Sequence, residues 1–211
     1  MRVEDLGVLP YLEAWDIQTA RHEAVMAGAE DVLLLVEHPA VLTLGANFHE
    51  ENLLFTPEQY KAKGIDVVRT DRGGDVTYHG PGQMVIYPIF DLQRHGRDLH
   101  RWMRGLEQTV IEVMSSLGLE GERFAPHTGV WRQGRKVAAI GVKVKRWVNL
   151  HGIAINCNNN LAPFSMIVPC GIQGYGVSSL SLELDREVTV EEVKPLVVES
   201  FQTVFGSTTT A

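Results

Sequence analysis

Apolar side chains recur every three or four residues in two long stretches of the chain, and this spacing predicts amphipathic helices at residues 11–29 and 99–117. Gly118 marks the end of the second helix. In a third stretch, a Thr-x-x-Glu capping box at residues 189–192 precedes an apolar segment that reaches residue 204, which predicts another helix. The expected core face of the first helix consists of Leu12, Trp15, Thr19, His22 and Met26.

Short apolar runs lie between these helices and predict strands at residues 31–36, 65–68, 84–90 and 147–156. Residues 128–131 and 136–144 flank a Gln133-Gly134 turn and predict a hairpin. A short helix at residues 57–63 is expected to begin at the cap Thr56. Because helices and strands are mixed and hairpins are frequent, the pattern predicts an α/β (α+β) fold with a mixed or antiparallel sheet. We expect a single domain over residues 1–206 and a flexible tail at 207–211.

Composition narrows the class of protein. The 211 residues carry a formal net charge of −7, which argues against a general nucleic-acid binder. No run of about 18 apolar residues is present, and the acidic first residues do not resemble a secretory signal. Two cysteines do not make a disulfide framework in a chain of this size, so we expect a reducing, cytoplasmic compartment.

Charge is distributed unevenly along the chain. Residues 123–182 contain no Asp or Glu, although they carry Arg123, Arg132, Arg135, Lys136, Lys143, Lys145 and Arg146. Such a segment in an acidic chain predicts a surface for an anionic partner. A chance run of strands with lysines on their solvent side would give the same pattern.

A glycine-rich segment at residues 72–83 is the first candidate for function. It reads Arg-Gly-Gly-Asp-Val-Thr-Tyr-His-Gly-Pro-Gly-Gln and lies between the predicted strands at 65–68 and 84–90. Glycine allows the backbone to approach a ligand closely, and the Arg, Thr, Tyr and His side chains supply polar groups. A long hairpin loop whose glycines only satisfy turn geometry is the alternative.

The two cysteines have different surroundings. Cys157 lies at the end of the predicted strand 147–156, where a buried and inert thiol is the ordinary expectation. Cys170 lies between Pro169 and Gly171, a sequence that presents a side chain at the tip of a loop. A nearby cation would lower the pKa of its thiol, and Lys136, at the start of an apolar strand, is a candidate, although a solvated hairpin lysine fits the same sequence. The histidines show no spacing typical of a metal site.

Five motifs in a fixed order resemble those of the lipoyl(octanoyl) transferases. They are Glu-His-Pro at residues 37–39, the glycine-rich segment at 72–83, Arg-Lys-Val-Ala-Ala-Ile-Gly at 135–141, His-Gly-Ile-Ala-Ile-Asn at 151–156 and Pro-Cys-Gly-Ile at 169–172. The similarity extends over residues 37–182.

The resemblance implies a fold like that of the biotin and lipoate protein ligases, with a larger and a smaller sheet flanked by helices. It implies transfer of an octanoyl group from octanoyl-acyl carrier protein to a lysine of a lipoyl domain, in 2-oxoacid dehydrogenase complexes or the glycine-cleavage H protein. No cofactor, metal or ATP is implied. Cys170 would be the acyl-bearing nucleophile and Lys136 its activating partner. The implied acyl site consists of Arg72, Gly73, Gly74, Asp75, Val76, Thr77, Tyr78, His79, Ala139, Ile140, Gly141, Gly152, Ile153 and Ala154.

Ala46 departs from the arginine that the resemblance leads us to expect after Thr43-Leu44-Gly45. The basic residues of the acid-free segment, chiefly Arg132, Arg135, Lys143, Lys145 and Arg146 together with Arg97, Arg101 and Arg104, form a candidate docking surface for the acidic carrier protein. Three other functions remain open on the sequence: an ATP-dependent lipoate or biotin ligase, a non-catalytic protein that binds acyl chains, and a thioesterase.

Overall fold

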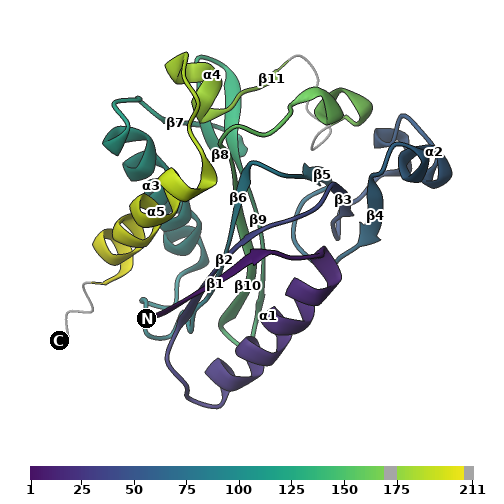
Figure 1. Ribbon diagram of the computed structural model, residues 1–211. Helices are drawn as coiled ribbons and strands as arrows, with labels where there is room; N and C mark the ends of the chain where they lie inside the picture. The colour runs from purple at the N-terminus through teal and green to yellow at the C-terminus, as the bar shows by residue number, and fades with distance from the viewer. Residues whose placement is uncertain (169–174, 207–211) are drawn as a thin grey trace.

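The computed structural model describes residues 1–168 and 175–206 (Figure 1). Cys170 and the predicted tail at 207–211 lie outside these ranges. Within them, the larger sheet has the order β1 (Arg2–Val8), β2 (Val32–Glu37), β6 (Gln83–Ile89), β10 (Val148–Asn156), β9 (Arg135–Lys145), β8 (His127–Arg132) and β7 (Glu122–Phe124), and β11 (Gly176–Val177) pairs with β9. The smaller sheet has the order β4 (Asp66–Arg69), β3 (Val41–Leu44) and β5 (Val76–His79).

Both sheets are mixed, which confirms the predicted fold class. β1 is parallel to β2 and β3 is parallel to β4, whereas β6, β10, β9 and β8 form antiparallel ladders. Helix α1 (Tyr11–Met26) lies on one face of the larger sheet, and α3 (Leu99–Ser116) and α5 (Val190–Phe205) pack together on the other (Figure 1). The remaining helices are α2 (Pro57–Ala62), α4 (Leu180–Leu184) and the short 3₁₀ turns η1 (Glu50–Asn52) and η2 (Ala162–Met166).

The continuous apolar run predicted at 31–36 is explained by this layering. In β2, Leu33 and Leu35 face the α3 and α5 side, whereas Leu34 and Val36 face α1. Because both faces of the strand are covered by helices, the strand does not show the alternation of apolar and polar residues that is typical of a sheet with one face in solvent. A third apolar cluster fills the smaller sheet, where Tyr60 of α2 and Phe164 of η2 pack against it.

The predicted core face of α1 is confirmed at His22 but was wrong for Leu12 and Thr19, and Trp15 and Met26 are only partly buried. Its buried residues are Tyr11, Ala14, Gln18, His22 and Val25. Leu12 is 56% exposed, and Thr19 is also exposed. The helix turns its polar Gln18 inward because the side-chain Oε1 accepts a hydrogen bond from the backbone N–H of His151, 3.0 Å away. Apolar spacing alone does not reveal a buried amide of this kind.

The glycine-rich segment is not a hairpin loop. The strands on either side of it, β4 and β6, belong to different sheets, and residues 76–79 within it form β5. The β-propensity of Val76, Thr77 and Tyr78 outweighs the surrounding glycines. The segment therefore carries the chain from the smaller sheet to the larger one. β1, β3, β7, β11, α4 and η1 were also not predicted.

Other predicted elements are confirmed. The β8–β9 hairpin turns at Gln133 and Gly134, which both have positive φ. Thr56 caps α2 and Thr189 caps α5. Cys157 is fully buried, and burial raises the pKa of its thiol to about 12, which leaves it protonated and inert. No helix within the described residues has the length and apolar character needed to cross a membrane.

Candidate active site

Two adjoining pockets lie between the two sheets, alongside β9 and β10. The first, called here the Lys136 pocket, is lined by Lys136, Trp131 and Tyr175 among others. The second, called the loop pocket, is lined by the glycine-rich segment, by β9 and by β10. They share Thr77, Ala139 and Ala154.

A β-bulge aims Lys136 into its pocket. Val130 pairs with Ala138, but Trp131 pairs with Lys136, so Val137 is an extra residue on β9. The bulge places Lys136 and Trp131 as a cross-strand pair, and the ammonium lies 4.8 Å from the centroid of the indole ring. Gly129 beside the bulge has no room for a side chain, since a Cβ there would lie 2.5 Å from the carbonyl oxygen of Ala138.

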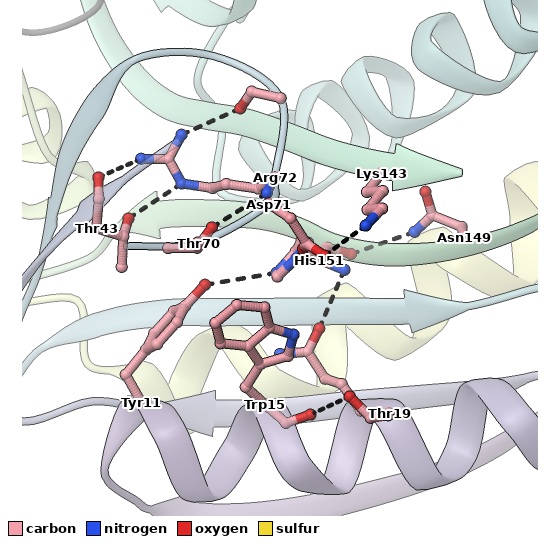
Figure 2. Close-up of polar contacts among 12 residues, drawn as sticks. Tyr11, Trp15, Thr19, Thr43, Thr70, Asp71, Arg72, Lys143, Asn149 and His151 are labelled. Atoms are coloured by element: carbon pink, nitrogen blue, oxygen red, sulfur yellow. Dashed lines mark hydrogen bonds and ion pairs between the residues drawn. The ribbon is translucent and has the colours of Figure 1, made fainter. Parts of the chain in front are cut away.

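Arg72 is buried and ties the glycine-rich segment to the smaller sheet. Its Nε donates to Oγ1 of Thr43 at 3.0 Å, and its Nη2 donates to the carbonyl oxygens of Thr43 at 2.5 Å and Asp75 at 2.7 Å (Figure 2). These bonds satisfy much of the guanidinium and hold its positive charge beside the loop pocket.

Two glycines allow the segment to rest directly on the larger sheet. The backbone N–H of Gly73 donates to the carbonyl of Val142 on β9 at 2.8 Å. A Cβ on Gly141 would lie 2.8 Å from the carbonyl oxygen of Gly73, closer than real Cβ atoms approach. The loop pocket therefore keeps its shape only while Gly141 has no side chain.

Asp71 fastens the same segment to β9 and β10. Its Oδ2 accepts from Nζ of Lys143 at 2.5 Å and its Oδ1 accepts from Nε2 of His151 at 2.7 Å (Figure 2). Partial burial raises the pKa of Asp71, but the hydrogen bonds from Lys143 and His151 outweigh it and leave the pKa below its ordinary value. Burial lowers the pKa of His151. The neutral ring donates through Nε2, and its Nδ1 faces the hydroxyl of Tyr11 at 3.4 Å.

Two further buried histidines, His79 in the lining of the loop pocket and His38 beside it, are also neutral. Burial lowers the pKa of His79 to about 3 and that of His38 to about 4. Nδ1 of His79 donates to Oε1 of Gln83 at 2.7 Å, and Nε2 of His38 accepts from the hydroxyl of Tyr87 at 2.8 Å. Neither ring is therefore poised to exchange a proton near neutral pH.

Most of the acyl-site residues expected from the sequence meet at the loop pocket. Asp75, Val76 and Tyr78 do not. The carboxylate of Asp75 accepts from Nδ2 of Asn52 at 2.5 Å, and Tyr78 packs against Phe164 within the smaller sheet's core, to which Val76 also belongs. The alternation of side chains along β5 sends Thr77 and His79 to the pocket and their neighbours to the other face.

Sequence reasoning missed several residues that line the pockets. Tyr11, Val85, Tyr87 and His151 line the loop pocket, and Trp131, Phe164 and Tyr175 line the Lys136 pocket. His151 begins the motif at 151–156, so that motif contained a signal for it. Tyr11 precedes every motif, and only the fold brings it to the site.

Acids from outside the acid-free segment pair with many of its basic side chains. Glu107 lies 3.1 Å from Arg123, and Glu183 lies 3.2 Å from Arg132 and 2.8 Å from Arg135. Lys143 pairs with Asp71. The segment is therefore less electropositive than its sequence indicates, because its acidic partners come from α3, from α4 and from Asp71, which precedes the glycine-rich segment.

Comparison with known proteins identifies the family. The family model described as "Lipoyl protein ligase A/B catalytic domain" matches residues 10–202. The chain belongs to this family. Within the family it is similar to the octanoyltransferase of Citrifermentans bemidjiense, with 48% identity over 202 residues that cover 96% of each chain. It is also 48% identical to the octanoyltransferase of Gloeobacter violaceus, over 95% of this chain and 88% of that one.

Solved structures of the lipoyl protein ligase A/B type share the fold. Lipoate-protein ligase A bound with ATP superposes with a TM-score of 0.78 at 17% identity, over 97% of this chain and 85% of that one. A bipartite lipoate protein ligase from Thermoplasma acidophilum, described with its E2 lipoyl domain, gives a TM-score of 0.76 at 16% identity. The match covers 97% of this chain and 83% of that one. At such identities the likeness establishes the fold alone.

Proposed function

We propose that this acyltransferase moves an octanoyl group from octanoyl-acyl carrier protein to a specific lysine of a lipoyl domain. The observation that carries the proposal is the near full-length similarity to octanoyltransferases. The joined pockets support it, because they offer a lysine side chain in one pocket and a mostly apolar lining, suited to an alkyl chain, in the other.

In the first step of the proposed mechanism, the Cys170 thiolate attacks the thioester carbonyl carbon. A new C–S bond forms, the bond to the carrier's pantetheine sulfur breaks, and that sulfur leaves and takes up a proton. The ammonium of Lys136 stabilises the thiolate before the attack. Cys170 lies outside the described residues. Tyr175, Gly176 and Val177, which follow its segment, line the Lys136 pocket.

In the second step, the acceptor lysine attacks the acyl-enzyme as a neutral amine. A C–N bond forms, the Cys170 C–S bond breaks, and Lys136 gives a proton to the departing Cys170 sulfur while it takes up the proton that the amine loses. One thioester is exchanged for another before the amide forms, so the sequence of steps needs no ATP. A reactive thiol requires a reducing environment, which supports the cytoplasm as the compartment.

The proposed acceptors are lipoyl domains of 2-oxoacid dehydrogenase complexes and the glycine-cleavage H protein. Support comes from the Thermoplasma acidophilum ligase, which was described together with an E2 lipoyl domain. The residues of this chain that contact an acceptor belong to the end of the Lys136 pocket that opens to solvent, because the acceptor amine has to reach the acyl group there.

For the acyl carrier protein, geometry favours the basic residues next to Lys136. Lys145 and Arg146 lie at the far end of β9, about 30 Å from Lys136 at the usual rise per residue of a strand. Arg132 and Arg135 are close to Lys136 and share the single carboxylate of Glu183, which leaves a net positive charge. We expect Arg135→Gln to raise KM for the carrier-bound donor and Arg146→Gln to leave it unchanged. A raised KM in Arg146→Gln and an unchanged KM in Arg135→Gln would instead place the carrier at the β9–β10 turn.

A turnover assay tests the proposal. Wild-type enzyme, octanoyl-acyl carrier protein and an apo lipoyl domain are mixed without ATP, and octanoylation of the domain is measured by intact mass. We expect product from the wild type and none from Cys170→Ser. The other cysteine of the chain supplies the control, since Cys157→Ala alters a buried thiol and should retain activity.

The ATP-dependent ligase is the second candidate, because a structural neighbour is a lipoate-protein ligase bound with ATP. That reaction would form an acyl-adenylate and would not need Cys170. Free octanoate with ATP and Mg²⁺ is therefore the discriminating substrate. Product formed from octanoate and ATP by both the wild type and Cys170→Ser would replace the proposal with the ligase reaction.

A further inference from the structure

Two aromatic rings close the end of the loop pocket that is farther from Lys136. Tyr11, the first residue of α1, and His151 on β10 both line this pocket, and both are almost completely buried. Figure 2 shows the Tyr11 side chain reaching from the helix towards the imidazole of His151. We call this pair the end wall.

The register of β9 and β10 sets the distance from the shared part of the two pockets to the end wall. Ala139 pairs with Ala154 where the pockets join, and His151 pairs with Val142 three residues farther along. Three steps along a strand cover about 10 Å. An extended octanoyl chain has seven C–C bonds of about 1.5 Å, which cover about 9 Å in a zigzag. A chain that enters at Ala139 therefore ends near the wall.

The end wall is supported from behind. The Tyr11 ring stacks on His79, with ring centroids 6.0 Å apart and an interplanar angle of 12°. Trp15 packs against His151 at 5.7 Å, and Asp71 holds Nε2 of the same imidazole. His151 also adopts a left-handed backbone conformation with φ of 57°, a strained position that its packing maintains. The wall therefore cannot retreat by a simple change of rotamer.

The polar atoms of the wall already have partners. The Tyr11 hydroxyl faces Nδ1 of His151, and Nε2 of the same ring donates to Asp71. What remains for a ligand is the carbon surface of the two rings. Such a surface suits the terminal methyl of an alkyl chain and disfavours a charged end group.

We propose that Tyr11 and His151 limit the length of the acyl chain that the enzyme accepts. The proposal rests on the proposed function, since it assigns the loop pocket to the octanoyl chain. A dodecanoyl chain, with eleven C–C bonds, spans about 14 Å and would meet the wall about 4 Å before its carbonyl reached Ala139. Donors of eight carbons fit, and donors of twelve do not.

The test measures kcat/KM with octanoyl and dodecanoyl carrier proteins for Tyr11→Ala. We expect the dodecanoyl-to-octanoyl ratio to rise at least about tenfold over that of the wild type, because pockets discriminate strongly against methylenes that they cannot hold. Tyr11→Phe keeps the ring and should keep the wild-type ratio. Leu12→Ala, at the exposed neighbouring position, is the matched control.

Tyr11→Leu provides a second enlarged pocket should Tyr11→Ala fold poorly, and thermal melting establishes which variants are folded. A folded enlarged variant that keeps the wild-type ratio would overturn the proposal. So would a wild type that accepts both chains equally. Failure of the proposed function looks different, because the wild type would then transfer neither chain.

Discussion

Replacing Trp131 by leucine removes the aromatic surface beneath the Lys136 ammonium. The two residues are held together by the bulge in the β8–β9 hairpin, and Nζ lies 4.8 Å from the ring centroid. Leucine keeps apolar bulk at this position but has no π-system to attract the cation. Lys136 would then spend less time in the orientation that places its ammonium in the pocket, and acylation of Cys170 should slow.

The size of the effect follows from the contact. A cation–π pair in a partly desolvated site contributes about 1 kcal/mol, and about 1.4 kcal/mol corresponds to tenfold in rate, so we expect acylation to slow about five- to tenfold. Shrinking this fully buried ring costs about 2–3 kcal/mol of stability. Its indole N–H is buried and has no hydrogen-bond partner among the described residues, so removing it returns about 1 kcal/mol or more. The variant should remain folded.

Single-turnover acylation, followed by intact mass, measures the effect directly. Trp131→Phe retains an aromatic face and should acylate within about threefold of the wild-type rate. Trp147→Leu is a matched control, because Arg97 lies 4.9 Å from the centroid of that indole at the opposite end of β9. A folded Trp131→Leu with the wild-type rate would refute the reasoning, as would an equal loss in Trp147→Leu.

Three further predictions concern the loop pocket and its supports. Gly141→Ala places a Cβ 2.8 Å from the carbonyl oxygen of Gly73, so we expect kcat/KM to fall about 100-fold. The free energy of unfolding, measured by chemical denaturation, should fall by about 1–3 kcal/mol. Wild-type kinetics would contradict the close contact. Asp71→Asn should lower the free energy of unfolding by about 1 kcal/mol, since the ion pair with Lys143 is partly exposed. Because the pKa of Asp71 is lowered in the folded state, this stabilisation is present above about pH 4 and lost in stronger acid. An equal loss of stability at about pH 3 and pH 7 would count against the role of Asp71 in fastening the segment. The pKa values of about 4 for His38 and about 3 for His79 lie below the unfolded value near 6.5, so the free energy of unfolding should fall as the pH drops from 6.5 towards 4. His79→Asn should make this pH dependence less steep. An unchanged slope would mean that His79 is not buried as a neutral ring.

Local patterns were sufficient for much of the fold. The run at 31–36 identified β2 because both of its faces are covered, and the capping residues Thr56 and Thr189 located two helices. The inward face of α1 was misassigned, since Gln18 is buried by a hydrogen bond from His151, a residue far away in the sequence. β5 was hidden by the glycines on either side of it.

The site was predictable where it coincides with a motif and was missed where it depends on tertiary contacts. Arg72, Thr77 and His79 meet at the loop pocket, but the alternation of β5 turns Val76 and Tyr78 away. Tyr11 reaches the pocket only because α1 packs across β10. The pairing of Arg132 and Arg135 with Glu183 was likewise invisible in a segment without acids.

The central claim is that Cys170 carries the acyl group. The most direct measurement mixes the enzyme with octanoyl-acyl carrier protein, without ATP or acceptor, and maps any added mass by peptide analysis. The account predicts one octanoyl group per chain, on Cys170, removable by hydroxylamine as a thioester and absent from Cys170→Ser. An unmodified wild-type chain, or an octanoyl group that appears only when ATP is added, would contradict it.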